Sequence, residues 1–286
     1  MSGRLGRRVV RGAGWGVAGL AGQLVVAVAT TAVLDALHRR RVLPPGELVE
    51  LADDRRLSAT SVADDLHDAL QRRGLAGPYV LVGHSLGGGY VRVFAARYPD
   101  EVAGLVLLDP VHEDQLARQP TEATEQLEQA QQQLAVAPLL ARLGAFRLLD
   151  VQRDTVASLP EDAGEQHRAR SVTAAGMHAY GREVGVLPDL LVEVADAEEA
   201  AGRTAFGGVP TVIISATEPG EGETPEAREA MNAMHRDLAG RSPTARHLTI
   251  SGADHLRLVT DPDHAREVAA PVLDLLAELD APQRDP

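Results

Sequence analysis

Uninterrupted apolar runs that alternate with helical patterns constrain the fold of this chain most. Residues 79–83 form one such run, which ends on Gly-His-Ser-Leu-Gly, and a helical pattern follows at 86–98. Further strand patterns lie at 102–108, 210–215 and 247–251. Strands this apolar are buried on both faces, which is typical of a parallel sheet covered by helices. The sequence therefore predicts an α/β fold with a mostly parallel central sheet.

The remaining patterns predict how the chain is organised around this sheet. A helix is predicted at 58–74, where Ser61 and Asp64 form a capping-box pattern, and a last helix follows Asp261 with Pro262 at its first position. Strand patterns are missing between 113 and 206, where helices are predicted instead at 125–137, 139–149, 165–180 and 187–201. We therefore expect an α/β core of residues 44–112 and 207–286, with a helical cap insertion at 113–206.

The serine at the end of the first apolar run has the setting of a nucleophile. Gly-x-Ser-x-Gly between a strand and a helix is the pattern of a nucleophile elbow, a tight and strained turn that exposes the serine oxygen. We expect the positions of Gly83 and Gly87 to require a small residue, because larger side chains there would clash. The backbone N–H of Leu86, at the start of the helix, is then available to stabilise a developing oxyanion beside Ser85.

Four stretches of the sequence resemble one known family. They are Pro44-Pro45-Gly46 with a predicted hairpin at 47–57, Gly-His-Ser-Leu-Gly-Gly, Leu-Val-Leu-Leu-Asp-Pro at 105–110, and Gly-Ala-Asp-His at 252–255. Together they resemble the α/β-hydrolase fold family, particularly its membrane-anchored bacterial members. The resemblance covers most of the chain from Pro44 onward, although the helical insertion matches only in position. It implies a serine hydrolase that cleaves a carboxylic ester or related acyl substrate through an acyl-enzyme on Ser85.

A serine nucleophile needs a base, and the base needs an acid that orients it. His255 follows the last strand pattern in a short loop, where the family places its base. Two positions are open for the acid. Asp109 ends the strand at 102–108, and Glu218 follows the next core strand, where most members of the family carry it; Glu221 lies in the same loop. No metal or organic cofactor is indicated.

The segment before the elbow strand is unusually short. Only one helix and two connections fit between Leu57 and Tyr79, whereas a strand-helix-strand unit takes about 30 residues or more. The resemblance therefore implies that N-terminal strands of the sheet are reduced and that the loop carrying a second oxyanion donor is missing. This observation supports a weak esterase. It also supports the alternative, a degenerate, non-catalytic binding protein tethered to a membrane.

The N-terminus differs from the rest of the chain. Four arginines within residues 4–11 precede an uncharged stretch from Gly12 to Leu34, and three arginines follow at 39–41. A span of about 20 apolar residues can cross a bilayer as a helix. We expect residues 1–41 to be a membrane helix or a cleaved signal peptide with a small-residue site at Ala27-Val28-Ala29; a core helix is the third reading. Both leading readings place the catalytic domain outside the cytoplasm.

Composition excludes several other classes of function. The formal charge of −13 argues against a general nucleic-acid binder, and the absence of cysteine excludes disulfides and thiolate catalysis. Dehalogenase and epoxide hydrolase chemistry is disfavoured because those family members carry an aspartate where Ser85 stands. An acyltransferase that uses the same acyl-enzyme is a close variant. The expected partners are a small ester or acyl substrate and a membrane, and the oligomeric state is open.

Overall fold

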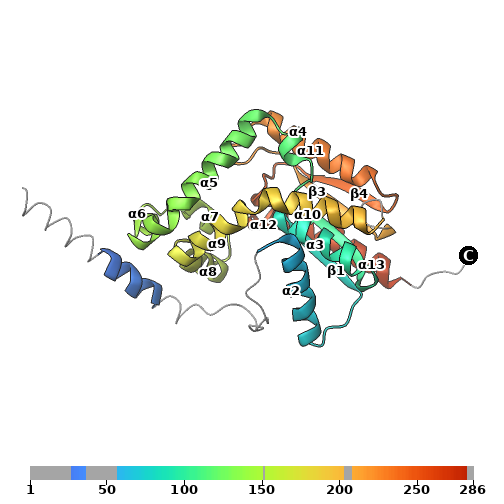
Figure 1. The fold of residues 1–286 in the computed structure, drawn as a ribbon, viewed down its shortest axis with the longest axis horizontal. Coiled ribbons are helices and arrows are strands. Elements are labelled where there is room, and N and C mark those ends of the chain that lie inside the picture. The colour runs from blue at the N-terminus through green and yellow to red at the C-terminus, as the bar shows by residue number, and fades with distance from the viewer. Residues whose placement is uncertain (1–26, 37–56, 151, 203–207, 282–286) are drawn as a thin grey trace, which may run out of the picture. The chain divides into compact units, whose positions relative to one another are not determined.

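The computed structural model describes residues 27–36, 57–150, 152–202 and 208–281 (Figure 1). It divides into two compact units, one made of Met1–Glu47 with Gln132–Gly181 and the other of Leu48–Gln131 with Arg182–Pro286. The second unit contains the sheet and all of the predicted site residues. The hairpin predicted at 47–57 lies outside the described residues, apart from Leu57.

The sheet of the described residues has four parallel strands in the order β1-β2-β3-β4. The strands are β1 (Tyr79–His84), β2 (Val102–Leu108), β3 (Thr211–Ala216) and β4 (Ala245–Ile250). Each lies within two residues of a strand predicted from the sequence. Because all four run in the same direction, Ser85, Asp109 and the loop after β4 meet at one edge, where parallel sheets of this kind bind their ligands.

Helices cover both faces of the sheet, as the continuous apolar runs predict. Side chains alternate between two cores along β2 and β3. Leu105, Leu107 and Ile213 pack with α2 (Ala59–Arg72), α3 (Leu86–Arg97), α10 (Leu187–Ala200) and Leu238 of α11 (Pro225–Gly240). Val106, Leu108, Val212 and Ile214 pack with α12 (Arg257–Thr260) and α13 (Pro262–Asp280). The sheet is therefore the middle layer of three.

The segment between β2 and β3 is helical, as predicted, but it divides differently from the expected insertion at 113–206. Its helices before α10 are α4 (Gln115–Arg118), α5 (Thr121–Arg142), α6 (Ala145–Leu148), α7 (Arg153–Ala157), α8 (Glu161–Ser171) and α9 (Ala174–Gly185). The single helix predicted at 165–180 is broken between α8 and α9. Helix α10 packs on α3 and belongs to the unit with the sheet, so the separate unit contains only Gln132–Gly181 of this segment.

The start of α2 corrects the predicted capping box. Ser58 is the N-cap, and its hydroxyl accepts the Ser61 N–H at 3.1 Å while the Ser61 hydroxyl accepts the Ser58 N–H at 3.0 Å. The box therefore begins three residues before the predicted pair Ser61 and Asp64. Asp64 instead accepts hydrogen bonds from Arg97 and Tyr98. These bonds tie α2 to α3.

The stretch before β1 holds one helix and no strand over residues 57–78. β1, which leads into the elbow, pairs only with β2 among the strands of the described residues, and Val82 on it is 49% exposed. This agrees with the short connection seen in the sequence. The expected loss of further N-terminal strands stays a prediction, because residues 37–56 lie outside the description.

The apolar N-terminal stretch from Gly12 to Leu34 lies mostly outside the described residues. Residues 27–36 are helical, Thr31 is buried, and Asp35 forms an ion pair with Arg147 beside it in the same unit. Within the ranges that the structure describes, no helix has the length and apolar character that crossing a bilayer requires. The expected N-terminal membrane helix is therefore not observed in these residues.

Candidate active site

Ser85 lies in a sharp turn between β1 and α3. Its φ of 57° and ψ of −123° are strained for a residue with a side chain. The turn is held by the Ser85 N–H, which donates to the Leu108 carbonyl at 3.0 Å, and by the Ser85 carbonyl, which accepts from Gly88 and Val111. The backbone of the elbow is thus fixed to the end of β2.

The glycines around the elbow have different roles from those expected. A Cβ on Gly83 would lie 2.4 Å from the Gly87 carbonyl oxygen, so Gly83 must be glycine, as predicted. A Cβ on Gly87 would meet nothing within 4 Å, so the steric reason expected for Gly87 is wrong: its Cβ would point into open space. Two further glycines, which the sequence reasoning missed, are also crowded. Gly88 lies against Pro110, and Gly89 lies against Leu190 of α10.

His255 and Asp109 are in direct contact. His255 Nδ1 lies 2.6 Å from Asp109 Oδ2. Asp109 is 2% exposed and has a φ of 43°, and its N–H donates to the Ile214 carbonyl at 2.7 Å. This backbone bond holds the carboxylate at the strand end, where the loop after β4 delivers His255.

The alternative acids do not contact His255. Glu218 is exposed, and its N–H and that of Thr217 both donate to the Ala253 carbonyl. Glu221 is also exposed. Asp254 accepts from the Leu256 and Arg257 N–H groups and so caps α12. Among the described residues, Asp109 is therefore the acid that the structure places against the histidine.

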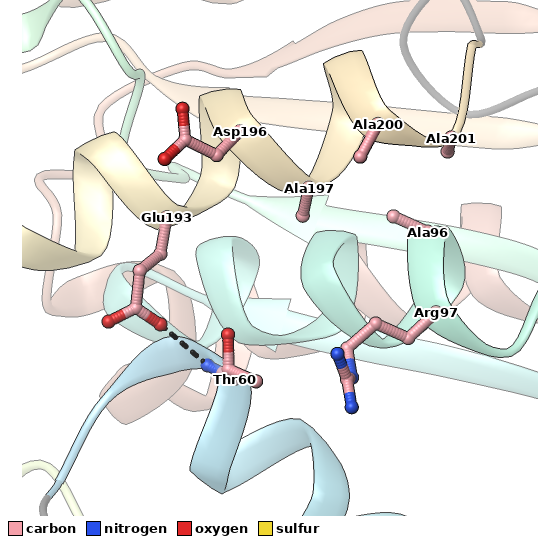
Figure 2. A pocket seen from close by; sticks show the side chains of 8 residues that line it. All are labelled: Thr60, Ala96, Arg97, Glu193, Asp196, Ala197, Ala200 and Ala201. Atoms are coloured by element: carbon pink, nitrogen blue, oxygen red, sulfur yellow. Dashed lines mark hydrogen bonds between the residues drawn. The ribbon is translucent and has the colours of Figure 1, made fainter.

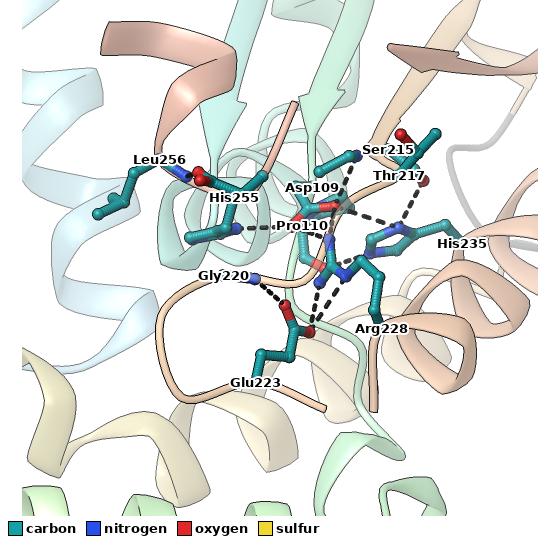
Figure 3. A network of polar contacts seen from close by, with 12 residues as sticks. Asp109, Pro110, Ser215, Thr217, Gly220, Glu223, Arg228, His235, His255 and Leu256 are labelled. Atoms are coloured by element: carbon teal, nitrogen blue, oxygen red, sulfur yellow. Dashed lines mark hydrogen bonds and ion pairs between the residues drawn. The ribbon is translucent and has the colours of Figure 1, made fainter. Parts of the chain in front are cut away.

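Asp109 is also surrounded by groups that the sequence reasoning missed (Figure 3). Arg228 on α11 donates from one terminal nitrogen to both carboxylate oxygens at 2.8 Å, and the Ala216 N–H donates to Oδ1 at 3.1 Å. Burial alone would raise the pKa of Asp109. The hydrogen bond from His255 and the charge of Arg228 instead hold that pKa well below its usual range. Asp109 is thus an anion near neutral pH.

His84 lies against the other side of His255. Its Nε2 is 2.9 Å from the His255 carbonyl oxygen, and the two rings are 4.5 Å apart. Since a carbonyl oxygen only accepts, this nitrogen of His84 carries the proton. Burial, followed by repulsion from His255, lowers the pKa of His84. His84 therefore supports the loop that carries His255.

One contact expected of a serine hydrolase site is not present in the described residues. No hydrogen bond joins the Ser85 hydroxyl to the His255 ring in the described part of the chain. Such bonds are often long without substrate and tighten when it binds. Leu86 is the first residue of α3, so its N–H has no partner within the helix, and it stays the predicted oxyanion donor.

A second polar cluster lies behind Asp109. His235 Nε2 is 2.8 Å from the Pro110 carbonyl, and the Ser215 hydroxyl lies between His235 Nδ1 and His247 Nε2 at 2.7 and 2.8 Å. Burial is the main cause that lowers the pKa of His235, to about 4. Arg228 and His235 were missed because helix α11 was not predicted.

The sequence does contain a signal for α11. Thr224 followed by Pro225 is a helix start, and Ala227, Met231, Met234 and Leu238 repeat at helical spacing. All four of these apolar side chains are buried in the structure.

A pocket of about 410 Å³ lies between α2, α3 and α10, away from the elbow (Figure 2). It is lined by small residues such as Ala197 and Ala200, while Glu193 accepts the Thr60 N–H at 2.8 Å and so caps the start of α2. None of the predicted site residues lines it. In the residues that the structure describes, no cluster of three or more His, Asp or Glu side chains could hold a metal ion.

A family profile for the alpha/beta hydrolase fold matches residues 44–181, which include the elbow and Asp109. The chain has the α/β-hydrolase fold. The parallel sheet covered by helices agrees with the fold that the resemblance led us to expect.

Curated relatives match only short stretches of this chain. Lipase LipV of Mycobacterium tuberculosis is 62% identical over 34 residues, which is 12% of this chain and 13% of the lipase. An uncharacterised protein of Schizosaccharomyces pombe is 52% identical over 48 residues, which is 17% of this chain and 9% of that protein. The chain therefore spans a small part of the length of either relative.

Solved structures match over most of the length. The crystal structure of a DbjA mutant has a TM-score of 0.58 and 15% identity, with 87% of each chain covered. MenH from S. aureus has a TM-score of 0.51 and 18% identity, with 84% of this chain and 82% of that chain covered. At this level of identity the similarity establishes the fold alone.

Proposed function

We propose that this α/β-hydrolase is a serine hydrolase that cleaves a carboxylic ester or related acyl substrate through an acyl-enzyme on Ser85. The observation that carries the proposal is the 2.6 Å contact between His255 and the buried Asp109, at the same sheet edge as the strained elbow. An ionised carboxylate can only accept, so the proton of neutral His255 resides on Nδ1. Its Nε2 is then free to act as a base.

The chemistry follows from these roles. The Ser85 oxygen attacks the acyl carbon as its proton passes to His255 Nε2, and the oxyanion forms beside the Leu86 N–H. The intermediate collapses when His255 protonates the leaving alcohol, which leaves the acyl group on Ser85. Water then attacks the acyl carbon, its proton passes to His255, and the acid product leaves with Ser85 regenerated.

The rate is expected to be low. A second oxyanion donor is normally supplied by a loop before the elbow strand, and residues 57–78 supply only α2 and its connections. The loss of one such donor costs roughly 10²–10³ in rate. Slow turnover of simple esters and slow labelling of Ser85 are therefore part of the proposal.

The substrate class rests on a serine nucleophile. Ser85 disfavours chemistry that needs a carboxylate nucleophile, and the short stretch matched by Lipase LipV points to the same broad class of ester substrates. The helices between β2 and β3 are proposed to select the substrate. The expected N-terminal anchor is proposed to place the domain at a membrane, outside the cytoplasm.

The test is hydrolysis of chromogenic acyl esters together with labelling by a fluorophosphonate. Ser85→Ala should lose at least about 10³-fold in kcat/KM and all labelling, because the nucleophile is gone. Ser251→Ala, at an exposed serine that follows β4, is the matched control and should behave like the parent. Parental activity in Ser85→Ala would refute the assignment. No labelling of the parent would support the non-catalytic alternative.

A further inference from the structure

Arg228 is a buried cation in contact with the acid of the proposed triad. It is 5% exposed, and it donates to both oxygens of Asp109 at 2.8 Å. Helix α11 brings it there, one turn after the helix begins at Pro225. A positive charge this close partly offsets the negative charge of Asp109. The Asp109 carboxylate therefore stabilises the protonated, positively charged form of His255 less strongly.

Glu223 holds the opposite side of Arg228. Its Oε1 lies 3.1 Å from Arg228 Nε and 3.0 Å from Nη2, and its Oε2 accepts the Gly220 N–H at 2.9 Å. The turn at 220–223 therefore fixes Glu223, as Figure 3 shows. Arg228 is shared between two carboxylates, so its effect on Asp109 depends on the charge of Glu223.

We propose that Arg228 and Glu223 are positioning residues that set, in opposite directions, the pH at which His255 loses its proton and can act as a base. The inference rests on the proposed function. Without Arg228, the charge of Asp109 is offset less, so His255 keeps its proton to higher pH. Without the charge of Glu223, Arg228 offsets Asp109 more strongly, so His255 loses its proton at lower pH.

The other charged and titratable groups around this histidine stay unchanged in such variants. Asp109 and His84 touch His255 directly, and His235 lies 3.8 Å from Asp109. The remaining groups on neighbouring segments are Asp254 and Arg257 beside His255, Asp261 and His264 at the start of α13, and Glu218 and Glu221 in the loop after β3. Asp254 caps α12, and Arg257 pairs with Asp261.

The opposite directions separate this proposal from a purely structural role. If Arg228 and Glu223 only stabilised the fold, removing either would lower activity or stability without a signed change in the pH profile. Arg228→Met removes the charge at similar volume, and Glu223→Gln removes the charge but keeps an oxygen for the Gly220 N–H. Arg228→Lys keeps the charge but not the guanidinium fork.

The first measurement is kcat/KM for a chromogenic ester against pH, in the full chain. The midpoint of the acidic limb should move up by about half a pH unit or more in Arg228→Met and down by a similar amount in Glu223→Gln. It should stay near the parental value in Arg228→Lys. Arg236→Gln is the matched control, because Arg236 lies on the same helix and pairs with Glu229 at the exposed surface.

The second measurement follows the His255 imidazole by NMR as the pH is changed, with the signal assigned by its loss in His255→Gln. It reports protonation without turnover, so it separates the inference from the proposed function. A parent without Ser85-dependent turnover would refute the function, while the two opposite shifts would still establish the role of the pair. Shifts of the same sign, or none, would overturn the inference. If Arg228→Met does not fold, the downward shift in Glu223→Gln decides alone.

Discussion

At the scale of single residues, Asp109 owes its position to an unusual backbone. A non-glycine residue with a φ of 43° is costly, and here it directs the carboxylate toward His255 while the N–H still reaches Ile214. Ser85 is strained in a similar way on the neighbouring strand end. Strain at both positions is compatible with folding because β2 lies between two other strands and holds both turns.

This geometry predicts a clear ranking of two carboxylates. Asp109→Asn should lower kcat of Ser85-dependent ester hydrolysis by about 10⁴-fold, because an amide favours the wrong tautomer of His255. Glu218→Gln should change kcat by less than about threefold, since Glu218 is exposed and does not contact the histidine. Steady-state kinetics of the two variants measure this. A larger loss in Glu218→Gln would move the acid to the loop after β3.

The sequence alone left these two acids open for a physical reason. Both follow parallel strands, so both are expected at the same sheet edge. The path of the loop after β3 determines which of the two acids lies against His255. Two successive N–H groups of this loop bind the Ala253 carbonyl, and Glu218 remains exposed. A tertiary contact of this kind has no signature in local patterns, whereas the elbow glycine Gly83 does.

At the scale of elements, one buried arginine joins α3 to its surroundings. Arg92 is 1% exposed and contacts Glu198 of α10 at 2.8 Å and Glu113, after β2, at 2.9 Å. Burial would raise the pKa of Glu113, but the charges of Arg92 and His112 and the hydrogen bond from Arg92 together outweigh it and lower that pKa to about 2. Helix α10 is thus attached to the sheet unit by an ion-pair network as well as by apolar packing.

The network makes stability depend on pH. Because the pKa of Glu113 falls from its ordinary 4.5 to about 2 on folding, its contribution is complete above pH 4.5 and is lost as the pH falls toward 2. Arg92→Met should lower the free energy of unfolding near pH 7 by about 3–5 kcal/mol and flatten its dependence on pH in that acidic window. Urea unfolding followed by circular dichroism at several pH values tests this.

The control is Arg246→Met, which breaks an exposed ion pair with Glu278. It should change the free energy of unfolding by no more than about 1 kcal/mol. If the free energy of unfolding depended on pH in the acidic range as steeply in Arg92→Met as in the parent, the network would not act through Glu113.

Elements differ in how well the sequence predicts them. All four strands and helices α2, α3, α10 and α13 were predicted close to their observed bounds, because their apolar periodicity is strong. Helix α11 was not predicted, although its buried apolar side chains repeat at helical spacing, and both groups behind Asp109 were missed with it. The packing of α10 on α3 depends on Gly89, a tertiary contact that local patterns do not reveal.

At the scale of the whole molecule, the chain combines an acidic body with a basic, apolar N-terminus. The formal charge is −13, although residues 4–11 alone contain four arginines. Most of the apolar stretch from Gly12 to Leu34 lies outside the described residues. The expected association with a membrane is therefore a prediction about the full chain.

Two charges in the apolar stretch test that prediction. In the double variant Leu24→Arg and Val26→Arg, each arginine costs about 2.5–3.5 kcal/mol if the stretch spans a bilayer. The parent should stay with membranes under alkaline carbonate extraction, and the variant should be released. Adding two arginines at exposed neutral sites, Gln126→Arg and Gln129→Arg, controls for the change in net charge. Release of the parent would remove the retained anchor from the proposal.

The hydrogen bonds that link Pro110, His235, Ser215 and His247 fix where the hydrogen atoms of these side chains reside. The Pro110 carbonyl can only accept, so neutral His235 carries hydrogen on Nε2 and presents a bare Nδ1 to Ser215. Ser215 must then donate to His235, and His247 must donate to Ser215. Above about pH 4 this series of hydrogen bonds has one arrangement of hydrogens, which neutron diffraction would reveal as deuterium at His235 Nε2. Because this series of hydrogen bonds ends at a backbone carbonyl, which has no proton to pass on, the side chains form a fixed support behind Asp109 and not a path for protons.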